Sequence, residues 1–202
     1  MNNFLELKNI SKIFNNSKRL KVLKNLSYKF KKGKTYSIMG PSGSGKSTLL
    51  NLISLIDRPT TGSINFDQSQ INFTENKKND IIRSKKIGII YQQNNLLPDF
   101  TALENIYLAS LSLYNDKDLA VSKAKRLLKL VGLLNRSDHY PSQLSGGESQ
   151  RIAIARAIIN DPEVILADEP TGSLDIDTAQ DVFKVLNSQK TSNRLIIFAT
   201  HN

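Results

Sequence analysis

The stretch Gly40-Pro-Ser-Gly-Ser-Gly-Lys-Ser47 decides the fold, because it fits the phosphate-loop pattern G-x-x-x-x-G-K-[ST]. A strand-like run over residues 35–39 precedes it, and a helical pattern over residues 46–56 follows it. Glycines allow successive backbone N–H groups to turn toward phosphate oxygens, and the helix N-terminus adds the positive end of its dipole. The stretch therefore predicts a strand–loop–helix unit that binds a nucleotide phosphate.

The loop also carries two side chains that suit phosphate chemistry. We expect Lys46 to bridge the β- and γ-phosphates of a nucleoside triphosphate, and the Ser47 hydroxyl to bind Mg²⁺. A chance Gly/Ser turn is the alternative, but at average residue frequencies the pattern arises in fewer than about one per cent of chains of this length. The residues predicted to contact the nucleotide here are Gly40, Pro41, Ser42, Gly43, Ser44, Gly45, Lys46, Ser47 and Thr48.

Outward from the loop, apolar runs alternate with helical patterns. Strands are predicted over residues 4–10, 22–30, 35–39, 87–91, 164–167 and 195–199, with a short one around 64–66 in the polar, turn-rich segment 57–86. Helices are predicted over residues 46–56, 102–113, 118–131, 148–159 and 176–186. Continuous apolar strands separated by helices are typical of an α/β fold, with helices on both faces of a mostly parallel sheet. Functional side chains are then expected at the carboxyl ends of the strands.

Composition narrows the function classes. The 202 residues contain no cysteine, which excludes disulfides, thiolate chemistry, zinc–thiolate sites and iron–sulfur clusters. Of the net charge of +10, residues 1–40 contribute +9, from ten Lys and Arg and one Glu. Such a segment is typical of contact with nucleic acid, an anionic membrane or a phosphate ligand, and compositional drift also explains it. We expect no nucleic acid partner, because no base-stacking or groove-reading element accompanies the charge.

No stretch of the sequence is long enough to cross a bilayer. The longest apolar runs, such as residues 164–167 and 195–199, are far shorter than the roughly 20 residues that a spanning helix needs. The first residues lack the apolar centre of a secretory signal. We therefore expect a cytosolic protein, or one that a partner holds at a membrane.

Two adjacent acids, Asp168 and Glu169, end the strand predicted over residues 164–167. In phosphate-loop proteins the strand-end Asp commonly holds Mg²⁺ together with the loop hydroxyl. Neighbouring side chains on a strand point in opposite directions, so we assign Asp168 to the metal and Glu169 to the attacking water, as general base. A solvated strand end is the alternative for such a pair, but the Pro-Thr-Gly turn that follows holds both acids at the edge of the sheet.

A second glycine motif, Leu144-Ser-Gly-Gly-Glu148, precedes the helix predicted over residues 148–159. Ser followed by two Gly at a helix start forms an anion site by the same backbone physics, and a plain N-cap turn is the alternative. The motif lies far along the chain from the phosphate loop, so one molecule cannot easily bring both to a single γ-phosphate. Two molecules arranged head to tail can do so.

These motifs together resemble those of the ATP-binding subunits of ABC transporters, whose LSGGQ-type motif is matched by the second glycine motif. The resemblance runs from about residue 4 to the end of the chain. It includes Gln92 after a strand, Asp175 in a Ser-Leu-Asp run, His201 after the final strand, and Phe14 ahead of the phosphate loop. Plain core packing is the alternative for Phe14, and a solvated strand end is the alternative for Gln92.

The resemblance implies a fold, namely a phosphate-loop NTPase of ABC type. It would be a single ATP-binding domain, residues 1–202, with a mostly parallel core sheet, an N-terminal antiparallel β-subdomain and a helical subdomain. In this division the β-subdomain and phosphate loop occupy about residues 1–86, and the helical subdomain about 92–158. Residues from about 159 to 202 return to the core sheet.

The resemblance also implies a composite site that uses ATP and Mg²⁺. ATP held by Lys46 of one copy would meet the second glycine motif of another copy, so that ATP joins the two. Glu169 would polarise the water, His201 would hold it in line with the γ-phosphate, and Asp175 would link the two sites. Gln92 would sense the metal and the γ-phosphate, and Phe14 would stack on adenine. The implied catalytic residues are Lys46, Glu169 and His201; the metal ligands are Ser47, Gln92 and Asp168; the nucleotide contacts outside the phosphate loop are Phe14, Gln92, Ser145, Gly146, Gly147, Glu148 and Asp175.

A narrower resemblance lies in Asn95-Leu-Leu-Pro-Asp-Phe-Thr-Ala-Leu-Glu-Asn105, which is similar to the matching segment of the LolD-type ATPases of the lipoprotein-releasing system. In the family this segment lies where ATPase subunits grip coupling helices of separate integral membrane subunits. The resemblance implies a peripheral ATPase on the cytoplasmic face of the bacterial inner membrane, in contact with the membrane only through its partners. It would power release of lipoproteins toward the outer membrane. Macrolide-export and cell-division ATPases of the same branch are the alternative.

Two other classes of protein fit the motifs less well than a transporter subunit. Soluble ABC ATPases of DNA repair or translation usually carry a coiled-coil insertion or two fused ATPase domains, and 202 residues leave room for neither. A nucleotide-gated module that scarcely hydrolyses is disfavoured by the presence of Glu169 and His201. Family members usually continue through a further strand and helix after this histidine, so the sequence is either unusually short or a piece of a longer protein.

Overall fold

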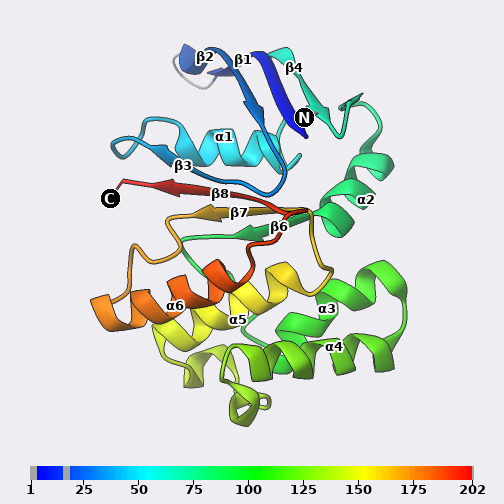
Figure 1. The fold of residues 1–202 in the computed structure, drawn as a ribbon, viewed down its shortest axis with the longest axis vertical. Helices are drawn as coiled ribbons and strands as arrows, with labels where there is room; N and C mark the ends of the chain where they lie inside the picture. The colour runs from blue at the N-terminus through cyan, green and yellow to red at the C-terminus, as the bar shows by residue number, and fades with distance from the viewer. Residues whose placement is uncertain (1–3, 16–18, 202) are drawn as a thin grey trace.

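The computed structural model describes residues 4–15 and 19–201, and it is built in layers (Figure 1). An antiparallel sheet of order β2-β1-β4-β5 lies at one end, and a parallel sheet of order β3-β8-β7-β6 lies in the middle. Helices fill the space between the sheets and cover the far face of the parallel one. The α/β fold with a parallel core and an N-terminal antiparallel sheet is therefore confirmed.

The antiparallel sheet is built on a long central strand. Its strands are β1 (Leu5–Asn15), β2 (Arg19–Phe30), β4 (Thr61–Phe66) and β5 (Ser69–Gln70). Strand β1 continues past residue 10, where the predicted strand ended, because irregularities in its pairing with β2 reset the register beyond the left-handed Asn9 (φ 49°). The extension places residues 11–15 on the sheet instead of in a loop.

The parallel sheet sets the position of the functional edge. Its strands are β3 (Thr35–Met39), β6 (Ile87–Ile90), β7 (Val164–Asp168) and β8 (Leu195–Thr200). Since all four run in the same direction, their carboxyl ends meet at one edge. The chain therefore brings the phosphate loop, the acid pair, Gln92 and His201 to that edge.

Both faces of the parallel sheet are buried, as its apolar strands predicted. Helix α1 (Lys46–Ile53) packs with Val164 and Leu166 in a core shared with the antiparallel sheet. On the opposite face, Ile165 and Ala167 pack with α5 (Gly146–Ile158) and α6 (Ile176–Ser188). Alternate residues of β7 thus enter two different cores.

A third core lies below α5 in the view of Figure 1. It is formed with α3 (Ala102–Tyr114) and α4 (Lys117–Leu130), in which apolar side chains recur at helical spacing. Short 3₁₀ turns, η1 (Leu134–Arg136) and η2 (Pro141–Gln143), lead from α4 back to α5.

The sequence predicts polar turns and one short strand over residues 57–86, and the structure differs from this prediction. The segment also forms α2 (Asn76–Lys86). The last turn of α2 is basic, and positive charge there stabilises the C-terminus of a helix. The neighbouring α1 is shorter than predicted and ends at Ile53. Leu55 takes a left-handed conformation (φ 61°) that turns the chain and keeps its side chain in the core, so the apolar run continues after the helix has stopped.

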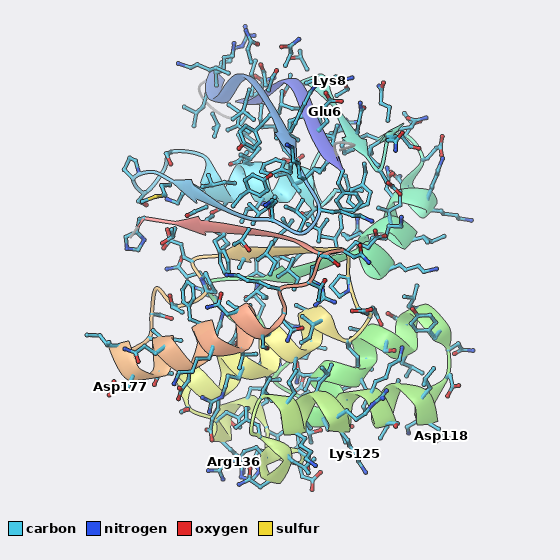
Figure 2. All side chains as sticks on the ribbon, viewed as in Figure 1. Glu6, Lys8, Asp118, Lys125, Arg136 and Asp177 are labelled. Carbon is cyan, nitrogen blue, oxygen red and sulfur yellow. The ribbon has the colours of Figure 1, made fainter. Side chains whose placement is uncertain are left out.

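Part of the basic charge of residues 1–40 is paired with acids. The Nζ atoms of Lys8 and Lys29 lie 3.2 and 3.3 Å from the Glu6 carboxylate on the outer side of the antiparallel sheet, where Figure 2 labels Glu6 and Lys8. Lys12 Nζ lies 2.6 Å from Asp57 Oδ1. Within the part of the chain that the structure describes, no helix is both long and apolar enough to span a bilayer.

Candidate nucleotide-binding site

The phosphate loop connects β3 to α1 and takes its shape from two glycines. Gly43 (φ 76°) and Gly45 (φ 92°) adopt left-handed conformations that other residues rarely take, and they turn the backbone around the start of α1. Among the described residues no side chain caps the first turn of this helix, and none of that turn is acidic. Its N–H groups are therefore available to an anion.

Lys46 is the buried cation of the site. Its side chain is only 7% exposed, and its Nζ donates hydrogen bonds to the carbonyl oxygens of Gly40 (2.8 Å) and Pro41 (3.1 Å). The same Nζ lies 3.5 Å from Glu169 Oε1. Carbonyl oxygens of its own loop thus hold the lysine beside the carboxylate of Glu169.

Glu169 begins the turn after β7 and does not continue the strand. Its backbone is left-handed (φ 45°), and its N–H donates to the carbonyl of Ala199 on β8 (2.9 Å). Its Oε2 lies 3.0 Å from His201 Nδ1, while Oε1 faces Lys46. The hydrogen bond to His201, followed by the contact with Lys46, holds the pKa of Glu169 below its ordinary value despite partial burial.

These side chains surround an open cavity of about 720 Å³ at the carboxyl edge of the sheet. The cavity is lined by the phosphate loop together with Glu169, Gln92 and His201. The three residues predicted to be catalytic, Lys46, Glu169 and His201, therefore surround one volume. Val22 of β2 also lines it, although no sequence pattern singled this residue out. The lining residues are Val22, Pro41, Ser42, Gly43, Gly45, Lys46, Ser47, Thr48, Gln92, Glu169 and His201.

Three side chains in or beside this cavity carry oxygen atoms that suit a Mg²⁺ ion. Ser47 and Gln92 line the cavity, and the half-buried Asp168 ends the strand next to Glu169. A hydroxyl, an amide and one carboxylate are oxygen donors of the kind that Mg²⁺ prefers. Within the described residues no group of three or more His, Cys, Asp and Glu side chains gathers as a metal cage. The donor set therefore fits an ion that shares its coordination with phosphate oxygens.

The second glycine motif stands at the N-terminus of α5, outside the cavity lining. Ser145 is the N-cap, and it forms a capping box with Glu148. Gly147 lies against α6, where a Cβ would meet the Thr178 side chain, and Asp175 caps α6 by accepting a hydrogen bond from the Thr178 N–H (3.0 Å). Two helix N-termini are thus packed side by side on a surface separate from the cavity.

Phe14, predicted to stack on adenine, lies on the extended part of β1 and pairs with Leu20 of β2. Its ring is half-buried beneath Lys12, whose Nζ lies 4.9 Å from the ring centroid. It is not among the residues that line the cavity. Its role in adenine binding stays a prediction.

The segment over residues 95–105 is organised by one buried amide. Asn105 is 1% exposed; its Nδ2 donates to the carbonyls of Leu97, Phe100 and Thr101, and its Oδ1 accepts from the Leu97 N–H. Thr101 caps α3 with a full capping box to Glu104. The loop is therefore fixed in shape while the side chains of Leu97 and Phe100 are 45% and 39% exposed.

Known proteins are similar to this chain in sequence and in architecture. The family model described as ABC transporter matches residues 23–172. The lipoprotein-releasing system ATP-binding protein LolD of Cytophaga hutchinsonii is 41% identical over 191 residues, which are 94% of this chain and 87% of that protein. LolD of Rickettsia bellii is 43% identical over 203 residues, which cover 100% of this chain and 90% of that protein.

A solved structure supports the same assignment. The dimeric post-hydrolysis state of the ATP-binding cassette MJ0796, bound to ADP and Pi, matches with a TM-score of 0.90 and 38% identity. The match covers 98% of this chain and 88% of that one. The chain therefore belongs to the ABC transporter family, as an ATP-binding subunit close to LolD.

Proposed function

We propose that this protein is the ATP-hydrolysing subunit of a bacterial ABC transporter, which dimerises around two ATP molecules and powers release of lipoproteins from the inner membrane toward the outer membrane. The observation that carries hydrolysis is the position of Glu169 between Lys46 and His201. Similarity to two LolD proteins supports the cargo, and the MJ0796 dimer supports the two-copy assembly. The proposed location is peripheral, on the cytoplasmic face of the inner membrane.

Binding of ATP begins at the phosphate loop. The N–H groups of the loop and of the first turn of α1 donate hydrogen bonds to the phosphate oxygens, and Lys46 exchanges the carbonyls of Gly40 and Pro41 for phosphate oxygens. Ser47, Gln92 and Asp168 would hold a Mg²⁺ ion, which supplies positive charge next to the phosphates. Phe14 is proposed to stack on the adenine.

Hydrolysis then needs a water molecule in line with the bond to be broken. Glu169 accepts a proton from this water as its oxygen attacks the γ-phosphorus, and the bond between phosphorus and the ADP oxygen breaks to give ADP and phosphate. His201 and, more weakly, Lys46 lower the pKa of Glu169, so Glu169 becomes a somewhat stronger base when Lys46 turns to the phosphates. His201, hydrogen-bonded to Glu169, is placed to orient the water.

The second copy completes the site. Ser145, Gly146 and Gly147 stand at a helix N-terminus outside the cavity of their own chain, so they suit the γ-phosphate of ATP bound by the other copy. Glu148 and Asp175 hold the starts of α5 and α6 in shape. ATP would thus be buried between two copies and join them.

The membrane partner is proposed to bind at the segment over residues 95–105. The loop held by Asn105 presents Leu97 and Phe100 to solvent, and rigid exposed apolar side chains suit an apolar helix of a partner. The sequence of this segment resembles that of the matching segment in lipoprotein-releasing ATPases, which supports the proposal. Movement of the partner would follow closure of the ATP-bound dimer.

Glu169→Gln tests the proposed chemistry. The variant keeps the shape of the side chain but cannot accept the proton, so ATP turnover should fall by about 10²–10⁴-fold. ATP-bound dimer should accumulate in light scattering, whereas the wild type without nucleotide should be mainly monomeric. Turnover near the wild-type rate would remove Glu169 from the mechanism, and a stable nucleotide-free dimer would contradict ATP as the joining ligand.

The cargo needs a separate test. Purification of the native complex should yield integral membrane subunits, and ATP should drive release of a lipoprotein from proteoliposomes that contain this complex. Transport of a macrolide, or copurification with cell-division proteins, would instead support the related ATPases. ATP-driven dimerisation with hydrolysis but without any membrane partner would support a soluble ABC ATPase, and nucleotide binding with scarcely any turnover would support a nucleotide-gated module.

A further inference from the structure

The carboxylate of Glu148 is shared between two donors at the second glycine motif. Its Oε2 accepts a hydrogen bond from the Ser145 N–H (2.8 Å), and its Oε1 accepts one from Arg136 Nε (3.1 Å). Ser145 Oγ in turn accepts from the Glu148 N–H (3.2 Å). These bonds close a ring around the start of α5, and Arg136 is the only member of it that comes from outside the motif.

Arg136 is itself held by a braced turn, at the end of η1 near the lower edge of Figure 2. Its Nη1 lies 3.2 Å from His139 Nε2. The carbonyls of Ser137 and His139 accept the first two N–H groups of α3, from Leu103 (3.0 Å) and Ala102 (2.8 Å). The guanidinium is therefore presented to Glu148 from a turn that α3 anchors.

The charge of Glu148 poses a problem that a glutamine at the same position would not. In the proposed dimer, Ser145 and the following N–H groups face the γ-phosphate of the other copy's ATP, and Glu148 adds a negative charge in the same helical turn. The Glu148 side chain is 18% exposed, so water screens its charge only partly. Arg136 places a positive charge against it at ion-pair distance.

We propose that Arg136 is a positioning residue for ATP-driven dimerisation, which neutralises Glu148 and fixes it where it orients Ser145. The proposal rests on the proposed function, because it assumes that Ser145 meets ATP across the dimer. Its distinctive content is electrostatic: Arg136 is needed because residue 148 is an acid. A turn that merely needed an arginine for packing would need it whatever residue 148 was.

The test compares Arg136→Gln, Glu148→Gln and the double variant, all in the Glu169→Gln background that accumulates dimer. Light scattering measures the ATP concentration that gives half-maximal dimer. Arg136→Gln should raise this concentration about tenfold, since it leaves an uncompensated carboxylate beside the phosphate. The added effect of Arg136→Gln should vanish when Glu148 is already glutamine. In the otherwise wild-type enzyme the same loss should appear mainly in KM for ATP.

Matched variants separate an electrostatic effect of Arg136 on dimerisation from a loss of folding. Arg136→Lys keeps the charge and should restore most of the affinity, and Arg126→Gln removes an exposed charge from α4 and should change nothing. The proposal is overturned if Arg136→Gln needs no more ATP for half-maximal dimer than its parent. It is also overturned if Arg136→Gln raises this ATP concentration as much in the Glu148→Gln background as it does alone. Failure of the parent itself to dimerise with ATP would instead overturn the proposed function.

Discussion

Gly147 tests how tightly α5 and α6 are packed, because its position leaves no room for a side chain. A Cβ added there would come within 3.0 Å of the Thr178 Cγ2 methyl, whereas ordinary contact begins near 3.4 Å. Overpacking of this kind typically costs about 1–3 kcal/mol. For a domain of this size, 1 kcal/mol shifts the melting temperature by about 2–4 °C. Gly147→Ala should therefore lower the melting temperature by about 2–12 °C in a circular-dichroism scan.

The neighbouring glycine provides the control. A Cβ on Gly146 would meet Leu174 Cδ2 at 3.7 Å, an ordinary contact. Alanine is also a better helix former than glycine by up to about 1 kcal/mol. The melting temperature of Gly146→Ala should therefore equal or exceed that of the wild type.

A second substitution tests the contact itself. Thr178→Ser removes the methyl group that Gly147→Ala would strike, and the next Thr178 atom, Cβ, lies at 3.4 Å. The double variant Gly147→Ala, Thr178→Ser should regain most of the lost stability. Equal melting temperatures of Gly147→Ala and Gly146→Ala would refute the view that the Thr178 methyl group requires glycine at position 147. So would a double variant that is no more stable than Gly147→Ala alone.

Two other variants probe Lys46 and a more distant ion pair. Lys46→Ala removes the cation of the phosphate loop and should weaken ATP binding at least about tenfold by calorimetry, since charged hydrogen bonds contribute about 1.5–3 kcal/mol each; unchanged affinity would contradict the assignment of the loop. Burial raises the pKa of Glu163, but hydrogen bonds from Lys32 and Lys86 outweigh it and leave the pKa below its ordinary value. A lowered carboxylate pKa stabilises the fold above about pH 5, and this stabilisation is lost as the pH falls through the folded-state pKa. The melting temperature of Glu163→Gln should therefore lie below that of the wild type at pH 7, and this deficit should shrink as the pH falls; an equal deficit at pH 7 and at pH 3 would contradict the ion-pair explanation.

The parts of the fold that depend on local pattern were predictable from sequence. The loop that begins at Gly40 and the apolar strand β7 each carry their signal within a few residues, and parallel strands bring their carboxyl ends together by geometry alone. Helix α2 was missed because its sequence is polar, with Ile81 and Ile82 as its only aliphatic residues, so helical periodicity is weak. The end of α1 was misplaced because Leu55 serves the core from a left-handed turn.

Details of the site that depend on distant contacts were not predictable. The sequence predicted that the side chains of Asp168 and Glu169 point in different directions along one strand, but not that Glu169 follows the strand with a left-handed backbone and pairs with His201. Val22 reaches the cavity only because β2 passes beside the phosphate loop. Arg136 carries no motif, and only folding shows that it binds Glu148.

The hydrogen bonds that Lys46 makes within its own loop also set a cost for any ligand that binds this lysine. A ligand of Nζ must replace two carbonyl oxygens and a nearby carboxylate, so the contacts that it makes are partly offset by those that it breaks. A triphosphate brings enough charge to draw the lysine away. On the proposed function, the affinity of the loop for ATP is thus the difference between the contacts that Lys46 gains and those that it gives up.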